Sequence, residues 1–299
     1  MSSQGLLQRT RCTLDKIGIK PSRKLGQNYV VDPSLIACML GAAGIGRGET
    51  VLEIGAGIGT LTRELASRAG RVIAVEKDAA AAEFLREEFG SDSSRGSRGG
   101  GISGSNVEVI TGDILLMELP EADKVVANLP YSISTPITFK LLTEGSFDKA
   151  VLTYQKEVAE RMAAAPGGRE YSRLSVASSL LAEVRVEGIF PPESFYPLPG
   201  VESAVVVMSR RADSGVDWPW LDDTLKALFS QRKRKLRKAL RTYSKIKRLE
   251  AIAVLSGIGM ELLEKRVFEL TPAEFVWLCE KLREIPGNAI PKACGGASK

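Results

Sequence analysis

Short apolar runs alternate with amphipathic stretches from Glu49 onward, and this alternation leaves few fold classes open. It is typical of a mostly parallel β-sheet whose two faces are covered by helices. The runs with the length of strands are Thr50–Ile54, Val72–Val75, Val107–Ile110, Lys124–Ala127, Ala150–Tyr154, Gly188–Phe190 and Ala204–Ser209, the last of them antiparallel. Amphipathic stretches at Leu61–Arg68 and Ala79–Phe89 predict helices between the first three strands. The sequence therefore predicts an α/β fold with a Rossmann-like sheet.

The C-terminal part of the chain lacks strand signals and follows a polar stretch, Arg210–Asp217. Apolar residues recur there at helical spacing, at Leu225, Leu228, Phe229, Leu236, Leu240 and Tyr243. Further short helices are expected at Ala251–Leu255, Glu261–Arg266 and Ala273–Arg283, the last one beginning at Thr271-Pro272. We therefore expect an α/β domain over residues 1–212 and a small helical domain over residues 213–299, with a loose tail from about Pro286.

The segment Ser91–Ser105 is rich in Gly and Ser and carries almost no apolar residue. This composition predicts a flexible insertion between a helix and the third strand.

The chain has no histidine among its 299 residues. This absence excludes Ser-His-Asp and Cys-His nucleophilic catalysis and histidine-ligated zinc. The four cysteines are scattered without a Cys-x-x-Cys pair, a pattern that favours reduced thiols over disulfides or a metal site. No apolar run approaches the roughly 18–20 residues that a membrane span needs. We therefore expect a soluble, cytoplasmic protein without a bound metal.

Basic residues are concentrated in one segment. The formal net charge is +5, and ten Lys or Arg without a single acid lie between Gln231 and Arg248, so the rest of the chain is net acidic. These cations are Arg232, Lys233, Arg234, Lys235, Arg237, Lys238, Arg241, Lys245, Lys247 and Arg248. Such a segment indicates a polyanionic partner. The alternative is an ordinary solvated helix face.

A glycine-rich turn follows the first predicted strand, in Val51-Leu-Glu53-Ile-Gly55-Ala-Gly57-Ile-Gly59. Glycines at such a turn let the backbone approach a ligand closely. A dinucleotide site is the obvious rival, but its pattern wants Gly or Ala where this chain has Thr60. The acidic Glu53 fits the ammonium group at the amino acid end of S-adenosylmethionine.

Two further acids follow successive strands. Glu76 ends the second strand, where a carboxylate accepts both hydroxyls of a ribose in NAD and S-adenosylmethionine alike. Asp113 follows the third strand and is placed to accept a hydrogen bond from a cofactor adenine amine. The alternatives are a solvated acid at Glu76 and a turn or capping residue at Asp113. Because open parallel sheets bind ligands at the carboxyl ends of their strands, we favour a nucleoside site.

The segment Asn128-Leu-Pro130-Tyr131 follows the fourth strand. An exocyclic adenine amine is a poor nucleophile because its lone pair is delocalised into the ring. The side-chain oxygen of Asn128 and the carbonyl of Pro130 are suited to accept its N–H groups and to favour a pyramidal nitrogen. Tyr131 is suited to stack on the base, a contact worth roughly 1–3 kcal/mol. The alternative is a simple tight turn.

Taken together, these motifs resemble those of the KsgA family of small-subunit rRNA adenine N6,N6-dimethyltransferases. The resemblance runs from about Pro21 to Arg283. Lys24-Leu-Gly-Gln27-Asn28-Tyr-Val resembles the family's N-terminal motif, which implies that Gln27 and Asn28 hold the cofactor. The later segment Phe190-Pro-Pro-x-x-Phe195-x-Pro-x-Pro199-x-Val201-x-Ser203 resembles the family's target-loop motif, which implies that Phe195 packs on the other face of the adenine. Phe229-Ser-Gln-Arg232-Lys233 resembles the C-terminal signature. Tyr29 stands where the family commonly has Phe.

The resemblance implies a class I methyltransferase sheet plus a small helical domain. The predicted cofactor set for S-adenosylmethionine is Gln27, Asn28, Glu53, Gly55, Gly57, Glu76, Lys77, Asp113, Ile114 and Asn128. The predicted catalytic set is Asn128, Pro130, Tyr131 and Phe195. The predicted RNA-binding set is Arg232, Lys233, Arg234, Lys235, Arg237, Lys238 and Arg241.

The implied reaction adds two methyl groups to the N6 amine of each of two adjacent adenosines, in a hairpin near the 3′ end of small-subunit rRNA. We expect a monomer, because the large partner is RNA. Three alternatives stay open at this point. They are a methyltransferase for large-subunit rRNA adenine, a ribosome assembly factor without catalysis, and a nicotinamide-dependent oxidoreductase.

Overall fold

The computed structural model describes residues 2–21, 26–90, 106–211 and 215–288. The expected flexible insertion at Ser91–Ser105 lies outside these residues. The chain divides into two compact units. The first comprises Met1–Glu160 and Leu181–Arg210, and the second comprises Arg161–Leu180 and Arg211–Lys299.

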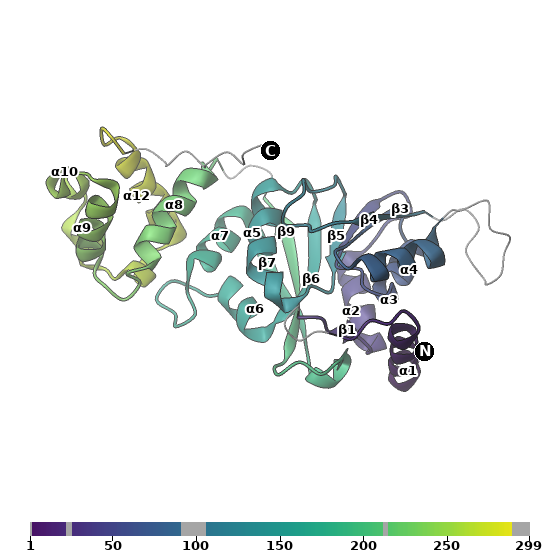
Figure 1. Cartoon of the computed structure of the whole chain (residues 1–299). Coiled ribbons are helices and arrows are strands. Elements are labelled where there is room, and N and C mark those ends of the chain that lie inside the picture. Colours follow the sequence, from purple (N-terminus) through teal and green to yellow (C-terminus); the bar gives the residue numbers. More distant parts are fainter. Residues whose placement is uncertain (1, 22–25, 91–105, 212–214, 289–299) are drawn as a thin grey trace. The chain divides into compact units, whose positions relative to one another are not determined.

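The first unit is built on a seven-stranded sheet in the order β4-β3-β2-β5-β6-β9-β7 (Figure 1). The strands are β2 (Thr50–Ile54), β3 (Arg71–Glu76), β4 (Val107–Thr111), β5 (Lys124–Ala127), β6 (Lys149–Gln155), β7 (Ala182–Phe190) and β9 (Ser203–Arg210). Strands β2 to β6 are parallel, and β9 runs antiparallel to both of its neighbours. The antiparallel strand was expected from the sequence. The predicted α/β class with a Rossmann-like sheet is confirmed.

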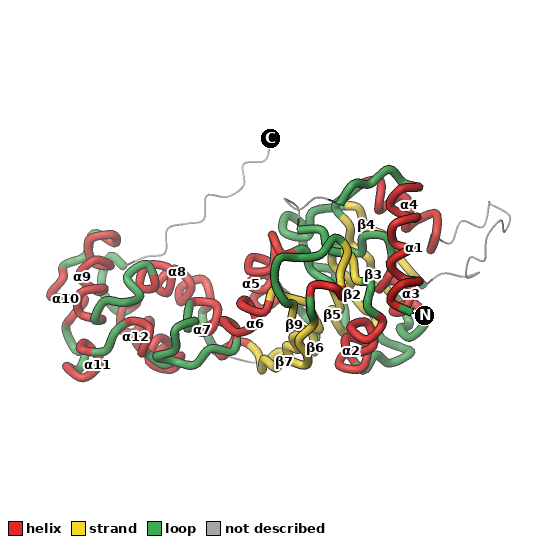
Figure 2. The backbone as a smooth tube through the Cα atoms, turned by 90° about the horizontal axis from the view of Figure 1, so that it is seen from below, coloured by secondary structure: helices red, strands yellow, loops and turns green. Residues whose placement is uncertain are grey.

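Helices cover both faces of this sheet. The first-unit helices are α1 (Ser3–Lys16), α2 (Pro33–Ala43), α3 (Thr60–Ala66), α4 (Ala79–Phe89), α5 (Ser134–Glu144) and α6 (Lys156–Met162). Leu35 and Met39 of α2 share a buried cluster with Val151 of β6. Tyr154 lies three residues after Val151 on β6, so its side chain points to the other face of the sheet, where it hydrogen-bonds Thr138 of α5. Helices α2 and α5 therefore lie on opposite sides of the strands (Figure 2).

Local capping signals fix where the helices begin. Asp32 accepts a hydrogen bond from the backbone N–H of Ser34 at 2.8 Å, and Pro33 occupies the first turn of α2. Asp78 caps α4 in the same way. Because α4 begins immediately after β3, this cap also fixes the backbone beside Glu76.

The central strands agree closely with the predicted ones, because strands buried on both faces are nearly continuous apolar runs. The prediction failed for β7, of which only Gly188–Phe190 was expected. Charged residues at Glu183, Arg185 and Glu187 interrupt its apolar pattern, and an edge strand tolerates them. A two-stranded sheet of β1 (Tyr29–Val30) and β8 (Phe195–Tyr196) was also missed, because two residues show no periodicity.

The second unit is helical and has its own core. Its helices are α7 (Arg173–Leu181), α8 (Trp218–Phe229), α9 (Leu236–Lys247), α10 (Ala251–Leu255), α11 (Met260–Glu264) and α12 (Pro272–Arg283). Thr271 and Glu274 form a capping box at the start of α12, where a helix start was predicted. The core gathers Leu225, Leu240 and Leu278 from three of these helices. The predicted helical C-terminal region is confirmed.

Two details of the predicted domain division differ from the structure. Residues 161–180 were assigned to the α/β domain, but Tyr171 and Val176 are buried in the core of the helical unit. The chain thus enters the helical unit twice. The tail was expected to be loose from Pro286, yet Asn288 is buried, where its side-chain amide donates to the carbonyl of Leu282 at 2.6 Å.

Candidate active site

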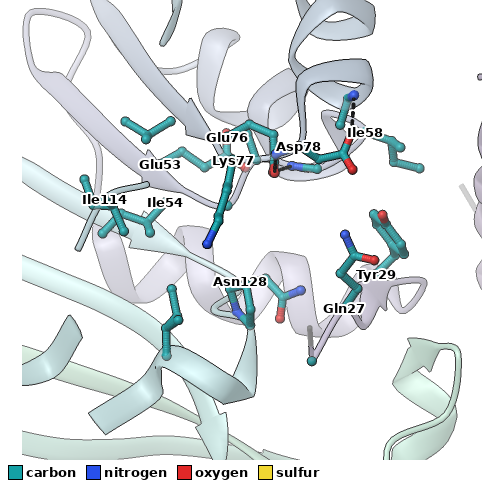
Figure 3. A pocket seen from close by; sticks show the side chains of 18 of the residues that line it. Gln27, Tyr29, Glu53, Ile54, Ile58, Glu76, Lys77, Asp78, Ile114 and Asn128 are labelled. Carbon is teal, nitrogen blue, oxygen red and sulfur yellow. Dashed lines mark hydrogen bonds between the residues drawn. The ribbon is translucent and has the colours of Figure 1, made fainter. Parts of the chain in front are cut away.

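A cavity of about 350 Å³ lies at the carboxyl ends of β2, β3, β4 and β5. This volume falls within the roughly 300–1,000 Å³ that is usual for small-molecule sites. The sheet order reverses between β2 and β5, and open α/β sheets bind ligands at such a point. All ten predicted cofactor residues line the cavity, namely Gln27, Asn28, Glu53, Gly55, Gly57, Glu76, Lys77, Asp113, Ile114 and Asn128. In Figure 3, Glu76 and Asp78 lie on one side of the cavity and Asn128 on the other, with Lys77 extending between them.

The glycine-rich turn forms one wall of the cavity. Gly55 and Gly57 have φ values of +71° and +56°, which side chains rarely adopt. A Cβ atom on Gly57 would lie 3.0 Å from the ring of Tyr29, and one on Gly55 would lie 3.2 Å from the ring of Pro130. The turn therefore needs glycine both for its backbone conformation and for its close neighbours.

Glu53 presents a buried carboxylate to the cavity. Its side chain is 2% exposed, and its Oε2 atom has no hydrogen-bond partner among the described residues. Burial is the main cause that raises the pKa of this carboxyl from 4.5 to about 8, and the nearby charge of Glu76 adds to the effect. An unpartnered buried carboxylate is costly unless a cation is bound against it. Glu53 is therefore suited to the ammonium group predicted from the sequence.

Glu76 is held in place by backbone N–H groups. Its Oε2 accepts from the N–H of Gly57 at 2.7 Å, and its Oε1 accepts from the N–H of Asp78 at 2.8 Å. Each carboxylate oxygen retains acceptor capacity after one such bond. The side chain is thus fixed and still able to accept the two hydroxyls of a ribose.

Asp113 and Lys77 form an ion pair at the carboxyl end of β4. The Lys77 Nζ donates to Asp113 Oδ2 at 2.9 Å, and the N–H of Leu115 donates to Oδ1 at 3.0 Å. The hydrogen bond from Lys77 is the main cause that lowers the pKa of Asp113. Asp113 is consequently a carboxylate acceptor at neutral pH, as an adenine amine requires.

Asn128 is fixed at both ends of its amide. Its Nδ2 donates to the backbone carbonyl of Asn28 at 2.7 Å, and its Oδ1 accepts from Thr153 Oγ1 at 2.7 Å. The N-terminal segment also packs against the Asn128-to-Tyr131 segment at Gly26, where a Cβ atom would lie 2.9 Å from the backbone nitrogen of Tyr131. The N-terminal segment and the Asn128-to-Tyr131 segment are thus in direct contact.

Pro130 is one of the residues that line the cavity, whereas Tyr131 is not. The carbonyl of Pro130 accepts from the N–H of Ile133 at 3.1 Å, which leaves one lone pair. The hydroxyl of Tyr131 hydrogen-bonds Ser203 of β9. Burial raises the pKa of Tyr131, so its phenol stays protonated.

The structure does not bring Phe195 to the cavity. Its side chain is 1% exposed and belongs to the core cluster beneath α2, because β8 pairs with β1 and aligns Phe195 with Val30. The predicted stacking of Phe195 on adenine therefore has no support from this arrangement. Its sequence motif contributes Ser203 to the site instead, through Tyr131.

Sequence reasoning missed several residues of the site. Tyr29 and Asp78 line the cavity, and Thr153 and Ser203 hold the predicted catalytic residues from behind. Tyr29 lies next to a recognised motif and was identifiable on that ground. Thr153 is part of an apolar strand and carries no sequence signal of its own.

The basic segment is only partly helical. Residues 230–235 form a turn between α8 and α9, so Arg232 to Lys235 do not continue the helix face that was predicted. Arg232 is not a free phosphate contact. Its guanidinium donates to the backbone carbonyls of Tyr171 and Gly168 at 2.9 Å and stacks over Phe268.

Other cations of this segment have acidic partners. Lys235 and Arg237 both contact Glu264, at 2.5 and 3.0 Å. Within the described ranges, the exposed cations of the segment for which no ion pair is present are Lys233, Arg234, Lys238, Arg241, Lys245 and Arg248. Arg232, Lys235 and Arg237 are therefore the weakest members of the predicted RNA-binding set.

Comparison with known proteins decides the family. Residues 19–277 match the model of a family described as ribosomal RNA adenine dimethylase. The chain belongs to this family. It is 44% identical over 288 residues to a probable ribosomal RNA small subunit methyltransferase A from Methanothermobacter thermautotrophicus, covering 95% of this chain and 99% of that one. The resemblance inferred from the motifs is confirmed.

Two solved structures of similar proteins support the fold assignment. A dimethyladenosine transferase from Plasmodium falciparum is 27% identical, with a TM-score of 0.71 over 86% of this chain and 98% of that chain. The 23S rRNA methyltransferase ErmE is 28% identical, with a TM-score of 0.59 over 86% of this chain and 100% of that chain. The fold of this chain is therefore similar to both structures over most of its length.

Two features are absent from the residues that the structure describes. No helix there is long and apolar enough to cross a membrane. No group of three or more His, Cys, Asp or Glu side chains is placed there to hold a metal ion.

Proposed function

We propose that the chain transfers methyl groups from S-adenosylmethionine to the N6 amines of two adjacent adenosines in the 3′-terminal hairpin of small-subunit rRNA. The relative at 44% identity is named as a small subunit methyltransferase, and the match covers nearly the full length of both chains. The observation that carries the proposal is the position of Asn128. Its fixed amide borders the same cavity as the carboxylates of Glu53, Glu76 and Asp113.

The residues of the cavity fit S-adenosylmethionine. Glu53 provides the carboxylate that an ammonium requires, and its buried Oε2, which has no hydrogen-bond partner among the described residues, is available to accept from it. Glu76 accepts from ribose hydroxyls, and Asp113 accepts from the adenine amine. When bound, this cofactor supplies a methyl group on a sulfonium, which is a reactive electrophile.

The residues of the chain position the target amine for methyl transfer and do not act as a strong acid or base. The Oδ1 of Asn128 and the carbonyl of Pro130 each retain one lone pair for the N–H groups of a target adenine. Acceptors placed there favour the pyramidal amine whose lone pair is free to attack. Holding two reactants in this way accounts for a large part of a transfer reaction's acceleration. The target base leaves its stack to reach these acceptors, as it does in other base-modifying enzymes.

The exposed cations of α9 and of the turn before it are the proposed phosphate contacts. They add affinity that does not depend on base sequence. We further propose that the protein acts as a monomer in the cytoplasm, where the precursor of the small ribosomal subunit is its partner.

The test is a methyl-transfer assay with labelled S-adenosylmethionine and unmodified small ribosomal subunits, followed by mapping of the modified bases. Dimethyladenosine at two adjacent positions is the expected result, and Asn128→Ala should lose it even at saturating S-adenosylmethionine. Transfer to large-subunit RNA only would assign the alternative substrate. Cofactor binding without transfer to either RNA would favour an assembly role without catalysis.

A further inference from the structure

Thr153 is a buried polar residue in the middle of the apolar strand β6. Its side chain is 0% exposed, and its hydroxyl donates to Asn128 Oδ1 at 2.7 Å. A buried hydroxyl in a strand core is costly unless it makes a hydrogen bond, so this contact accounts for a polar residue at that position. The other described polar neighbour of the Asn128 amide is the carbonyl of Asn28.

The two hydrogen bonds of the Asn128 side chain fix the orientation of its amide, with Nδ2 toward Asn28 and Oδ1 toward Thr153. The hydroxyl of Thr153 meets the oxygen, and the carbonyl of Asn28 can meet only the nitrogen. Rotating the amide by half a turn would break the bond to Asn28 and set two carbonyl oxygens against each other. A threonine in a strand has few side-chain rotamers, so its hydroxyl is held in place as well.

We propose that Thr153 is a positioning residue that keeps the Asn128 oxygen turned to the target amine, and that the second methyl transfer depends on it more than the first. This inference rests on the proposed function and adds a residue and a product specificity to it. The first transfer begins from an amine with two N–H groups, which Asn128 and Pro130 hold together. The second begins from an amine with one N–H group, so its orientation depends on a single acceptor.

The decisive variant is Thr153→Val, which keeps the branched shape of the side chain and removes only the donor. We expect single-turnover transfer of the first methyl to fall about tenfold at most, the change that losing one hydrogen bond produces. We expect the second transfer to fall further, so that monomethyladenosine accumulates where the wild type leaves dimethyladenosine. Thr153→Ser retains the hydroxyl and restores the dimethylated product.

The matched control is Thr138→Val on the opposite face of the sheet. Thr138 is also 0% exposed. Its hydroxyl hydrogen-bonds the backbone carbonyl of Ser134 and the hydroxyl of Tyr154, both at 2.7 Å, and does not line the cavity. It reports what losing a buried threonine hydroxyl does to stability alone. Its ratio of mono- to dimethyladenosine should equal that of the wild type.

Cofactor affinity and thermal unfolding are measured for each variant beside the product ratio. A wild-type product ratio in Thr153→Val, or an equal shift in Thr138→Val, would overturn the inference. If Thr153→Val fails to bind cofactor, Thr153→Ala removes the same donor with less bulk, and its product ratio decides in the same way. The proposed function fails separately, when the wild type itself transfers no methyl group to small subunits.

Discussion

At the scale of a single residue, the buried carboxyl of Glu53 lowers the stability of the folded protein when it is ionised, and it is available to bind a cation. The sequence places an acid before the glycine turn and so predicts an ammonium partner, but it does not show that the carboxylate is buried or that Oε2 lacks a partner. Those properties depend on the residues packed around the carboxyl, which include Thr62 of α3. The same limit applies to Thr153, because a hydroxyl in an apolar strand has no sequence context that reveals what it touches.

The free protein should become more stable when Glu53 is replaced by Gln. The pKa of Glu53 is about 8 in the folded protein against an ordinary 4.5, so the folded protein holds this proton more tightly than the unfolded chain. The stability that results is present below pH 4.5 and is lost as the pH rises to about 8. We expect Glu53→Gln to unfold at a higher temperature than the wild type at pH 8.5, with the difference shrinking toward pH 4.5.

The same variant should bind S-adenosylhomocysteine more weakly, since the ammonium loses its counter-charge. Calorimetric titration at pH 6.5 in two buffers of different ionisation enthalpy should detect close to one proton released by the wild type, and none by Glu53→Gln. A lower unfolding temperature for Glu53→Gln at pH 8.5, or equal proton release, would contradict the assigned role.

The element that joins the two halves of the site is the N-terminal segment from Gly26 to Val30. Its short strand β1 was missed by sequence analysis, whereas β2 and β5 were predicted to the residue, because buried parallel strands are long apolar runs. The segment contacts the Asn128-to-Tyr131 segment at Gly26 and at the carbonyl of Asn28. Such long-range pairing has no local pattern in the chain.

Replacing Gly26 with Ala tests this element. Gly26 has φ of +65°, and a Cβ atom there would lie 2.9 and 3.0 Å from the backbone nitrogens of Tyr131 and Ser132. We expect Gly26→Ala to displace the target segment and lower methyl transfer at least about tenfold, since small misplacements of reacting groups are costly. Cofactor affinity should fall less than the transfer rate.

Gly18 offers a matched control for backbone strain. Its φ is +69°, and a Cβ atom there would meet no atom within 4 Å. Gly18→Ala therefore carries the same conformational cost, about 1–3 kcal/mol for a left-handed residue, without the clash. Equal loss of transfer in Gly18→Ala and Gly26→Ala would show that strain alone, and not contact with the target segment, is responsible.

At the scale of the whole molecule, the candidate active site and the basic segment belong to different units of the chain. The cavity lies within the α/β unit, and the cluster of basic residues lies within the helical unit. The sequence predicted this separation from strand signals and charge alone. It could not predict that residues 161–180 join the helical core, because the turn residues Pro166-Gly-Gly lie inside this segment and no linker marks its ends. Nor could it distinguish Arg232, which holds three backbone carbonyls, from its exposed neighbours.

The pairing of these cations leads to a prediction about RNA binding that charge counting does not make. Lys238 and Arg241 are exposed on α9, and no ion pair involves them in the described ranges, while Lys235 and Arg237 share Glu264.

Lys238→Gln with Arg241→Gln removes the same charge as Lys235→Gln with Arg237→Gln. Each phosphate contact contributes roughly 0.7–0.9 to the slope of log affinity against log salt. Binding to unmodified small subunits, measured over a series of KCl concentrations, should lose up to roughly 1.4–1.8 from this slope in the first double variant. The second should lose less, because Glu264 already neutralises part of that charge. Equal slopes in both double variants would mean that RNA displaces Glu264, and an unchanged slope in the first would remove α9 from the proposed interface.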